Sequence, residues 1–248
     1  MRSRYPAASS FAYSFGPGPL TPAIKALIIA NVAMFVLTFI VPSITLWLGL
    51  RPQDVFTGLA IWQPVTYLFL HGGIFHILFN MLALWMFGTE LERMWGSRYF
   101  TRYYFITGVG AAATTLVLSL MPIGAADQLY YSLTIGASGA VYGILLAYGM
   151  YFPNRPIYLY FIFPIPAKYF VMIVGAISLF ASMGGGGGVA HTAHLGGLVV
   201  GYLYLKGTRF HPVSEIKYRY LKWRINRMRR KFDIVSGGRA DDVNRRVH

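Results

Sequence analysis

Long uncharged stretches are the feature that most constrains the fold of this chain. Each is long enough for at least one helix of about 20 residues across the hydrocarbon core of a bilayer. They cover residues 26–50, 55–89, 103–126, 128–154 and 169–205. Apolar residues occupy 56% of all positions, more than the roughly 45–50% of a soluble domain. We therefore expect an all-α polytopic membrane protein.

The last stretch is too long for one helix and is broken by Ser182-Met183 and five glycines, so it should hold two spans. The predicted spans are 23–41, 74–92, 101–121, 136–153, 166–182 and 189–206. The sequence thus predicts a six-helix domain over 21–206, between a polar N-terminal segment at 1–20 and a basic tail at 207–248.

Lysine and arginine indicate the orientation, because cytoplasmic loops carry an excess of these residues. Of the 22 in the chain, only Arg51 falls in a predicted external segment. Both termini are therefore predicted to be cytoplasmic. Residues 1–20 lack an apolar core followed by a small-residue cleavage site, so the first span is expected to be a retained anchor. The plan favours a multi-pass protein of a prokaryotic cell membrane.

The net charge of +14 comes mostly from residues next to the membrane, so no nucleic-acid partner is expected. In the tail, apolar residues recur at helical spacing among basic ones: Leu221, Ile225, Met228 and Phe232. This pattern predicts a helix on anionic lipid. A solvated basic tail that only enforces topology is the alternative. The oligomeric state is not predicted.

Three connections have distinctive compositions. Residues 42–73 are apolar and long for a loop, so short helices at the outer interface are expected. Residues 156–167 contain three prolines and should not form a regular helix. Residues 184–188 are all glycine, and such a loop could move aside for a large substrate.

Polar residues within spans are candidates for function, since they are costly to bury in lipid. They are Asn31, His76, Asn80, Ser138, His191 and His194. No Asp or Glu lies deep in a span and no His-Glu-x-x-His motif exists, which argues against aspartyl and zinc proteases. Cysteine is absent, which excludes a thiol nucleophile. What remains suits a serine activated by an imidazole, with no cofactor or metal.

Ser138 lies between Gly136 and Gly139, and Tyr142 follows it by one helical turn. His194 shares a helical stripe with Gly197 and Gly201, so another helix can approach its face closely. If that helix is the fourth span, Ser138 and His194 can touch. His191 lies one turn earlier, and spacing alone does not exclude it as the base.

His76 and Asn80 form an i, i+4 pair that could donate hydrogen bonds to a developing oxyanion. An interhelical polar clamp is the plain structural alternative. The predicted topology puts His76, Ser138 and His194 near the outer ends of their helices, at one depth. Water can reach that depth through a cavity open to the outside.

The chain resembles the rhomboid family of intramembrane serine proteases from about residue 60 to 205. The motifs that carry the resemblance are HILFN at 76–80, Gly88 to Glu92, GASG at 136–139 with Gly143, and AHLGG at 193–197 with Gly201. They lie in this order on the second, fourth and sixth predicted spans. Many members carry Trp-Arg in the first loop, where this chain has Trp62-Gln63.

The resemblance implies that Ser138 is the nucleophile and that His194, not His191, is its base. It also implies an oxyanion hole formed by the Ser138 N–H, His76 and Asn80, with Tyr142 packed under the imidazole. The implied substrates are transmembrane proteins, which enter past the fifth helix and the loop after it.

The sequence is also compatible with two other functions. One is an inactive relative that binds membrane proteins without cutting them. The other is a metal-dependent hydrolase or transporter that uses His71, His76, His191 and His194, which no acidic residue joins.

Overall fold

The computed structural model describes residues 17–124, 126–159, 163–183, 188–209 and 222–227. Within these residues it is mostly helical. Contacts divide the chain into two units, Met1–Tyr204 and Leu205–His248. In the second unit, residues 222–227 are helical. Ile225 of the predicted lipid-binding face is among them and is exposed, whereas Leu221, Met228 and Phe232 lie outside the described residues. The lipid-binding helix therefore stays a prediction.

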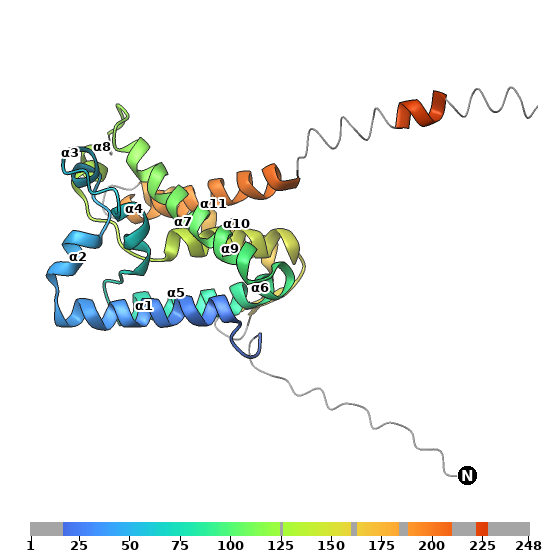
Figure 1. Ribbon diagram of the computed structural model, residues 1–248, viewed down its shortest axis with the longest axis horizontal. Helices are drawn as coiled ribbons and strands as arrows, with labels where there is room; N and C mark the ends of the chain where they lie inside the picture. The colour runs from blue at the N-terminus through green and yellow to red at the C-terminus, as the bar shows by residue number, and fades with distance from the viewer. Residues whose placement is uncertain (1–16, 125, 160–162, 184–187, 210–221, 228–248) are drawn as a thin grey trace, which may run out of the picture. The chain divides into compact units, whose positions relative to one another are not determined.

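The long helices of the structure fall on the predicted spans, with ends that differ by a few residues (Figure 1). They are α1 (Pro22–Ile40), α5 (Ile74–Ala83), α7 (Ser97–Leu118), α9 (Ser138–Tyr151), α10 (Ala167–Met183) and α11 (Gly188–Arg209). A wide π-helical turn, η2 (Leu84–Gly88), continues α5 into α6 (Thr89–Trp95). By length and hydropathy, Pro22–Ile40 and Ile74–Trp95 are candidate membrane spans, and Ala167–Ser182 is a shorter apolar helix.

The connection at 42–73 contains short helices, as predicted from its length and apolar character. They are α2 (Ser43–Leu48), α3 (Pro52–Thr57), α4 (Gln63–Thr66) and the 3₁₀ helix η1 (Tyr67–Phe69). A further short helix, α8 (Ala126–Tyr131), lies between α7 and α9 and contacts α3.

Gln63, which stands where many rhomboid proteins have arginine, forms hydrogen bonds that hold this connection together. Its buried side chain accepts a hydrogen bond from the Arg51 N–H at 3.0 Å. Its amide nitrogen donates to the Trp47 carbonyl and to Asp54, each at 3.4 Å. An uncharged amide therefore joins three points of the loop.

Two strands, β1 (Pro156–Leu159) and β2 (Phe163–Pro166), pair antiparallel. The three prolines correctly indicated that no regular helix forms here, but they did not predict a strand pair. Pro156 and Pro166 face each other at the end of the strand pair. A two-stranded ribbon has only edge strands, where proline is tolerated because its missing N–H need not pair.

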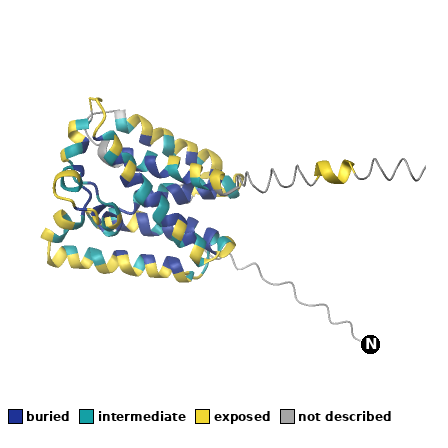
Figure 2. Ribbon diagram, turned by 45° about the horizontal axis from the view of Figure 1, so that its top comes forward, coloured by how far each residue is buried: buried dark blue, intermediate teal, exposed yellow. Residues whose placement is uncertain are grey.

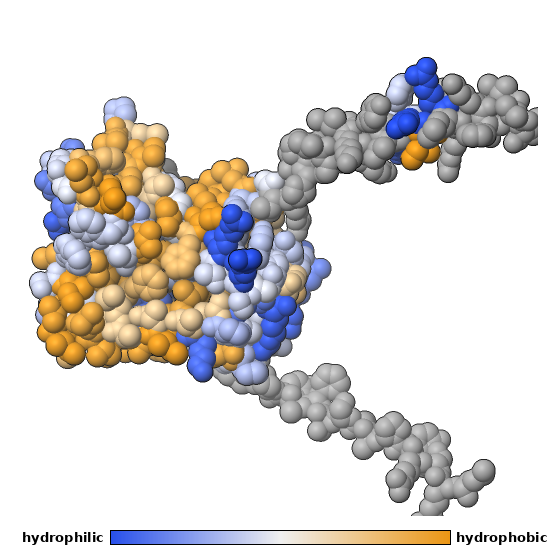
Figure 3. Space-filling view, in the orientation of Figure 1, coloured by the Kyte–Doolittle hydropathy of each residue, from blue (hydrophilic) through white to orange (hydrophobic). Residues whose placement is uncertain are grey.

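The surface of the helical body is apolar. Helix α1 is exposed along most of its length (Figure 2), and Phe39 is 83% exposed. Figure 3 shows apolar side chains over much of one face, with hydrophilic residues gathered near α6. Contiguous apolar surface of this extent is rare on a soluble monomer and is expected where lipid surrounds a protein.

Glu92 joins the start of α1 to α6 and α7. Its buried carboxylate accepts hydrogen bonds from the N–H groups of Ala23 and Ile24, at 2.9 and 3.0 Å, and from the Thr21 hydroxyl. The Ser97 hydroxyl also donates to it, at 2.5 Å. A carboxylate from a distant helix therefore caps the N-terminus of α1, where N–H groups lack intrahelical partners.

Glycines let α9 and α11 approach closely. A Cβ atom on Gly197 would lie 2.0 Å from the carbonyl oxygen of Gly139. One turn further, a Cβ atom on Gly201 would lie 3.4 Å from the Gly143 Cα atom. Backbones therefore meet directly along the stripe that the sequence predicted.

Candidate active site

Ser138 is the first residue of α9, and the turn before it is held by the backbone of the 42–73 connection. Gly136 has φ +124°, a conformation that favours glycine. Its N–H donates to the Tyr67 carbonyl at 2.9 Å. Two further backbone hydrogen bonds, of 2.8 and 2.9 Å, pair Thr134 with Leu50. The serine is therefore positioned by main-chain contacts to a segment far earlier in the sequence.

The structure brings Ser138 and His194 together. The Ser138 Oγ and His194 Nε2 atoms are 2.8 Å apart, within the range of a good hydrogen bond. In a neutral imidazole that accepts the serine proton at Nε2, the other proton is on Nδ1. His194 Nδ1 is buried and has no hydrogen-bond partner among the described residues. No carboxylate of the described chain therefore orients this ring.

Tyr142 supplies the orientation by stacking. Its ring lies parallel to that of His194, with the centroids 4.1 Å apart and an interplanar angle of 8°. The Tyr142 hydroxyl accepts a hydrogen bond of 3.0 Å from Ser178 on α10. Ser178 is fully buried and was missed at the sequence level. The signal was present, because Ser178 is a hydroxyl residue within a predicted span.

His191 lies next to His194 and meets its ring edge-on, with centroids 5.5 Å apart. Their positions in the sequence did not show which of the two histidines contacts Ser138. In the structure it is His194 whose ring nitrogen lies at hydrogen-bond distance from Ser138. His191 therefore belongs to the surroundings of that pair.

His76 lies on the other side of the serine turn. A Cβ atom on Gly136 would come within 2.7 Å of His76 Nε2 and 3.7 Å of Ser138 Oγ. The Gly72 N–H donates to His76 Nδ1 at 3.3 Å. Because Nδ1 accepts, the proton of the neutral ring belongs on Nε2, the nitrogen beside Gly136. His76 can therefore present a donor beside Ser138.

Asn80 lies one turn after His76 and is buried. Its side-chain nitrogen donates to the His76 carbonyl at 2.9 Å, so the amide engages its own helix. A cavity of about 380 Å³ adjoins both residues between α5 and α9. Its walls are Phe75, His76, Phe79, Asn80, Ala83, Val141, Tyr142 and Leu145. The two sequence-predicted donors thus face a largely apolar hollow next to Tyr142.

His71 precedes α5 and packs edge-on against His76, with ring centroids 4.9 Å apart. Burial, together with the neighbouring His76, lowers the pKa of His71 to about 4. The ring is therefore neutral at physiological pH. Among the described residues, no group of three or more His, Cys, Asp or Glu side chains converges as a metal site.

The Rhomboid domain family model matches residues 59–209, which hold all of these side chains. Rhomboid protein 1, mitochondrial, of Saccharomyces cerevisiae is 33% identical over 138 residues, which make up 55% of this chain and 38% of the relative. Rhomboid protease GluP of Bacillus subtilis is 31% identical over 147 residues, 57% of this chain and 25% of the relative.

Rhomboid protease GlpG of Serratia proteamaculans is 32% identical over 193 residues, 75% of this chain and 61% of the relative. The chain thus spans less than two thirds of the length of each of these curated relatives. The family match covers more than half of the chain and includes the helices that carry Ser138, His194 and His76. The chain belongs to the rhomboid family of helical membrane proteins.

Proposed function

We propose that this protein is an intramembrane serine endopeptidase that cleaves transmembrane or membrane-proximal peptide bonds through an acyl-enzyme on Ser138. The observation that carries the proposal is the 2.8 Å separation of Ser138 Oγ and His194 Nε2. A serine hydroxyl is a weak nucleophile until a base within hydrogen-bond reach takes its proton. The relatives named as rhomboid proteases support the same activity.

In the proposed reaction, Ser138 Oγ attacks the substrate carbonyl and its proton passes to His194 Nε2. The resulting imidazolium then protonates the leaving amine, and a water molecule, activated by the same histidine, releases the acyl group. Stacking on Tyr142 holds the imidazole face. The ring can therefore keep its direction without a third hydrogen-bonding residue.

The oxyanion of the tetrahedral intermediate would be stabilised by the Ser138 N–H and by His76 Nε2–H. Ser138 is the first residue of α9, and the first N–H groups of a helix have no intrahelical acceptor. Asn80 joins this group in the proposal once its amide turns from the His76 carbonyl toward the cavity. Removing one such donor costs about 10²–10³ in rate in soluble serine proteases.

We propose further that the six long helices all span the membrane, as one domain over residues 21–206, with both termini in the cytoplasm of a prokaryotic cell. The positions of the reactive groups support this topology. Ser138 and His76 lie in the first turn of α9 and α5, and His194 lies in the first half of α11. In the proposed topology α5, α9 and α11 are the second, fourth and sixth spans, so all three begin on the outer side of the membrane. The reactive groups then lie at one depth, which water could reach.

The proposed substrates are transmembrane segments. The apolar cavity between α5 and α9 could take up a side chain next to the scissile bond, because Phe75, Phe79 and Leu145 line it beside His76. Aromatic contacts of Phe87 with Tyr148 and Phe170 close the seam between η2, α9 and α10. The glycine loop that was predicted to move aside lies mostly outside the described residues.

A fluorophosphonate probe on detergent-solubilised protein tests the function. We expect covalent labelling of wild type that is lost in Ser138→Ala and is unaffected by chelator. Loss of labelling in chelator would support the metal-dependent alternative. Folded wild type that neither labels nor cleaves any transmembrane test substrate would support the inactive, binding-only relative.

A further inference from the structure

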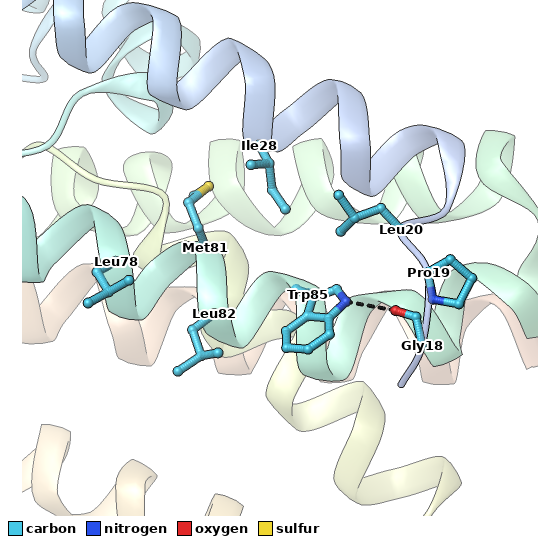
Figure 4. Close-up of a pocket in the computed structure, with 8 residues that line it drawn as sticks. All are labelled: Gly18, Pro19, Leu20, Ile28, Leu78, Met81, Leu82 and Trp85. Carbon is cyan, nitrogen blue, oxygen red and sulfur yellow. Dashed lines mark hydrogen bonds between the residues drawn. The ribbon is translucent and has the colours of Figure 1, made fainter. Parts of the chain in front are cut away.

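A second groove, of about 430 Å³, opens between the start of α1 and the face of α5 that points away from the active-site cavity (Figure 4). Ile28 lines it from α1, and Leu78, Met81 and Leu82 line it from α5. The active-site cavity uses other α5 positions, namely Phe75, His76, Phe79, Asn80 and Ala83. One helix therefore separates the two hollows.

One end of the groove is closed by residues 17–20, which are hydrogen-bonded to η2 and α6. The Trp85 indole N–H donates to the Gly18 carbonyl at 3.1 Å, as drawn in Figure 4. The Arg93 guanidinium donates to the carbonyl of Pro17 and, at 3.0 Å, to that of Pro19. The groove thus has an apolar floor and one polar, hydrogen-bonded end.

Arg93 brings positive charge to this closed end. An Nη atom of Arg93 lies 3.5 Å from the place of a Cβ atom on Gly18, a wall residue. Arg93 is exposed and forms no ion pair with a carboxylate of the described residues. Lys25, three positions before Ile28, is also exposed. The adjacent carboxylates are engaged elsewhere, because Glu92 caps α1 and Glu90 pairs with Arg155.

The width of the groove determines which kind of ligand can enter it. Helices α1 and α5 are in direct contact, and the axes of packed helices lie only about 8–10 Å apart. A third helix, about 10–12 Å across with its side chains, cannot enter the seam between them. An extended hydrocarbon chain can enter. The seven steps along the helix from Leu78 to Trp85, at about 1.5 Å each, give the groove a length of about 10 Å.

We propose that this groove binds one acyl chain of an anionic phospholipid, whose phosphate is held by Arg93 and Lys25. The apolar walls bury the chain, and the cations at the closed end meet the headgroup. The closed, charged end of the groove lies on the side at which α1 begins, which is the cytoplasmic side in the proposed topology. Because α5 is the wall between this groove and the active-site cavity, the bound chain packs against the helix that carries His76.

The test uses full-length protein in nanodiscs that contain phosphatidylglycerol with a photoactivatable group near the end of one acyl chain, and mass spectrometry to map the adducts. We expect adducts on the 18–28 and 78–85 segments. Ile28→Trp should remove most of this labelling by filling the groove. Ile29→Trp, whose position is 57% exposed, is the matched control and should label as wild type. Leu78→Trp repeats the test from α5.

A second set of experiments tests whether the basic residues bind the lipid headgroup. Replacing the probe by a zwitterionic phosphatidylcholine should lower labelling, and Arg93→Gln should reduce the preference for the anionic lipid about fivefold, as expected for one basic side chain near an anionic surface. Arg98→Gln, exposed on α7, is the control. Labelling spread evenly over α1 in every variant would overturn the proposal. Cross-links from the groove to a second protein copy would also overturn it, in favour of a helix-packing surface.

Discussion

Substituting alanine for Gly197 should separate the serine from its histidine without touching either. The new Cβ atom would lie 2.0 Å from the Gly139 carbonyl oxygen, and real Cβ atoms essentially never come within 3.0 Å of a heavy atom. Since the obstacle is backbone, α9 and α11 must move apart by about 1.0 Å. Ser138 adjoins Gly139, and His194 lies one turn before Gly197.

If that displacement falls along the line between Ser138 Oγ and His194 Nε2, their separation grows from 2.8 Å to about 3.8 Å, beyond hydrogen-bond range. A misplacement of about 1 Å can reduce turnover about 100-fold. We therefore expect kcat/KM for a transmembrane substrate, and the rate of fluorophosphonate labelling, to fall by about two orders of magnitude in Gly197→Ala.

Gly175→Ala is the matched control for this variant. Its Cβ atom would meet only the flexible Leu198 side chain, at 3.3 Å, so activity should stay near that of wild type. Thermal unfolding in detergent separates misplacement from loss of the fold. A Gly197→Ala protein that unfolds cooperatively and cleaves at the wild-type rate would refute the claim that backbone contact between α9 and α11 sets the active-site distance.

Three further outcomes follow from contacts described above. Tyr142→Phe keeps the stacked ring and should retain most activity, whereas Tyr142→Ala should lose about tenfold or more in kcat. Equal kcat values for these two variants would show that stacking does not orient His194. Glu92→Gln should lower the free energy of unfolding by about 1.5–3 kcal/mol, because a charge-assisted cap is lost. Glu90→Gln is the control, since Glu90 pairs with an arginine that is half exposed. Equal unfolding midpoints for the two variants would contradict the capping role. The pKa of His71 is about 4 in the folded state and about 6.5 in the unfolded state. His71 should therefore contribute to stability above pH 6.5, where the ring is neutral in both states. That contribution, up to about 3 kcal/mol, should be lost as the pH falls toward 4, because the unfolded state binds a proton first. His71→Gln should remove this slope, and parallel stability curves for variant and wild type between pH 4 and 7 would count against it.

The sequence predicted the parts of this molecule that depend on local patterns. Helix positions followed from apolar stretches, and the glycine stripe on α11 predicted that another helix approaches the face of His194. The same stripe could not choose between His191 and His194, because one helical turn separates residues on nearly the same face. That choice needed either the family resemblance or the packed structure.

Contacts between distant segments were not predictable in the same way. Glu92 caps α1 from about seventy positions away, and nothing in the local sequence of either segment indicates the partner. Ser178 reaches Tyr142 only because α9 and α10 pack together. The sequence showed only that Gln63 replaces the usual arginine in the first loop. The structure gives it three hydrogen-bonded neighbours.

The turn before Ser138 has a consequence for how this protein acquires its chemistry. Thr134 and Gly136 are fixed by main-chain hydrogen bonds to Leu50 and Tyr67. Ser138 therefore cannot take its position until the early connection has folded and packed against the start of α9. Closing so long a loop costs entropy before its contacts compensate. In a nascent or partly folded chain, Ser138 is therefore present but is not yet positioned next to His194. Under the proposed function, the ability to cleave should be among the last properties that the folding chain gains.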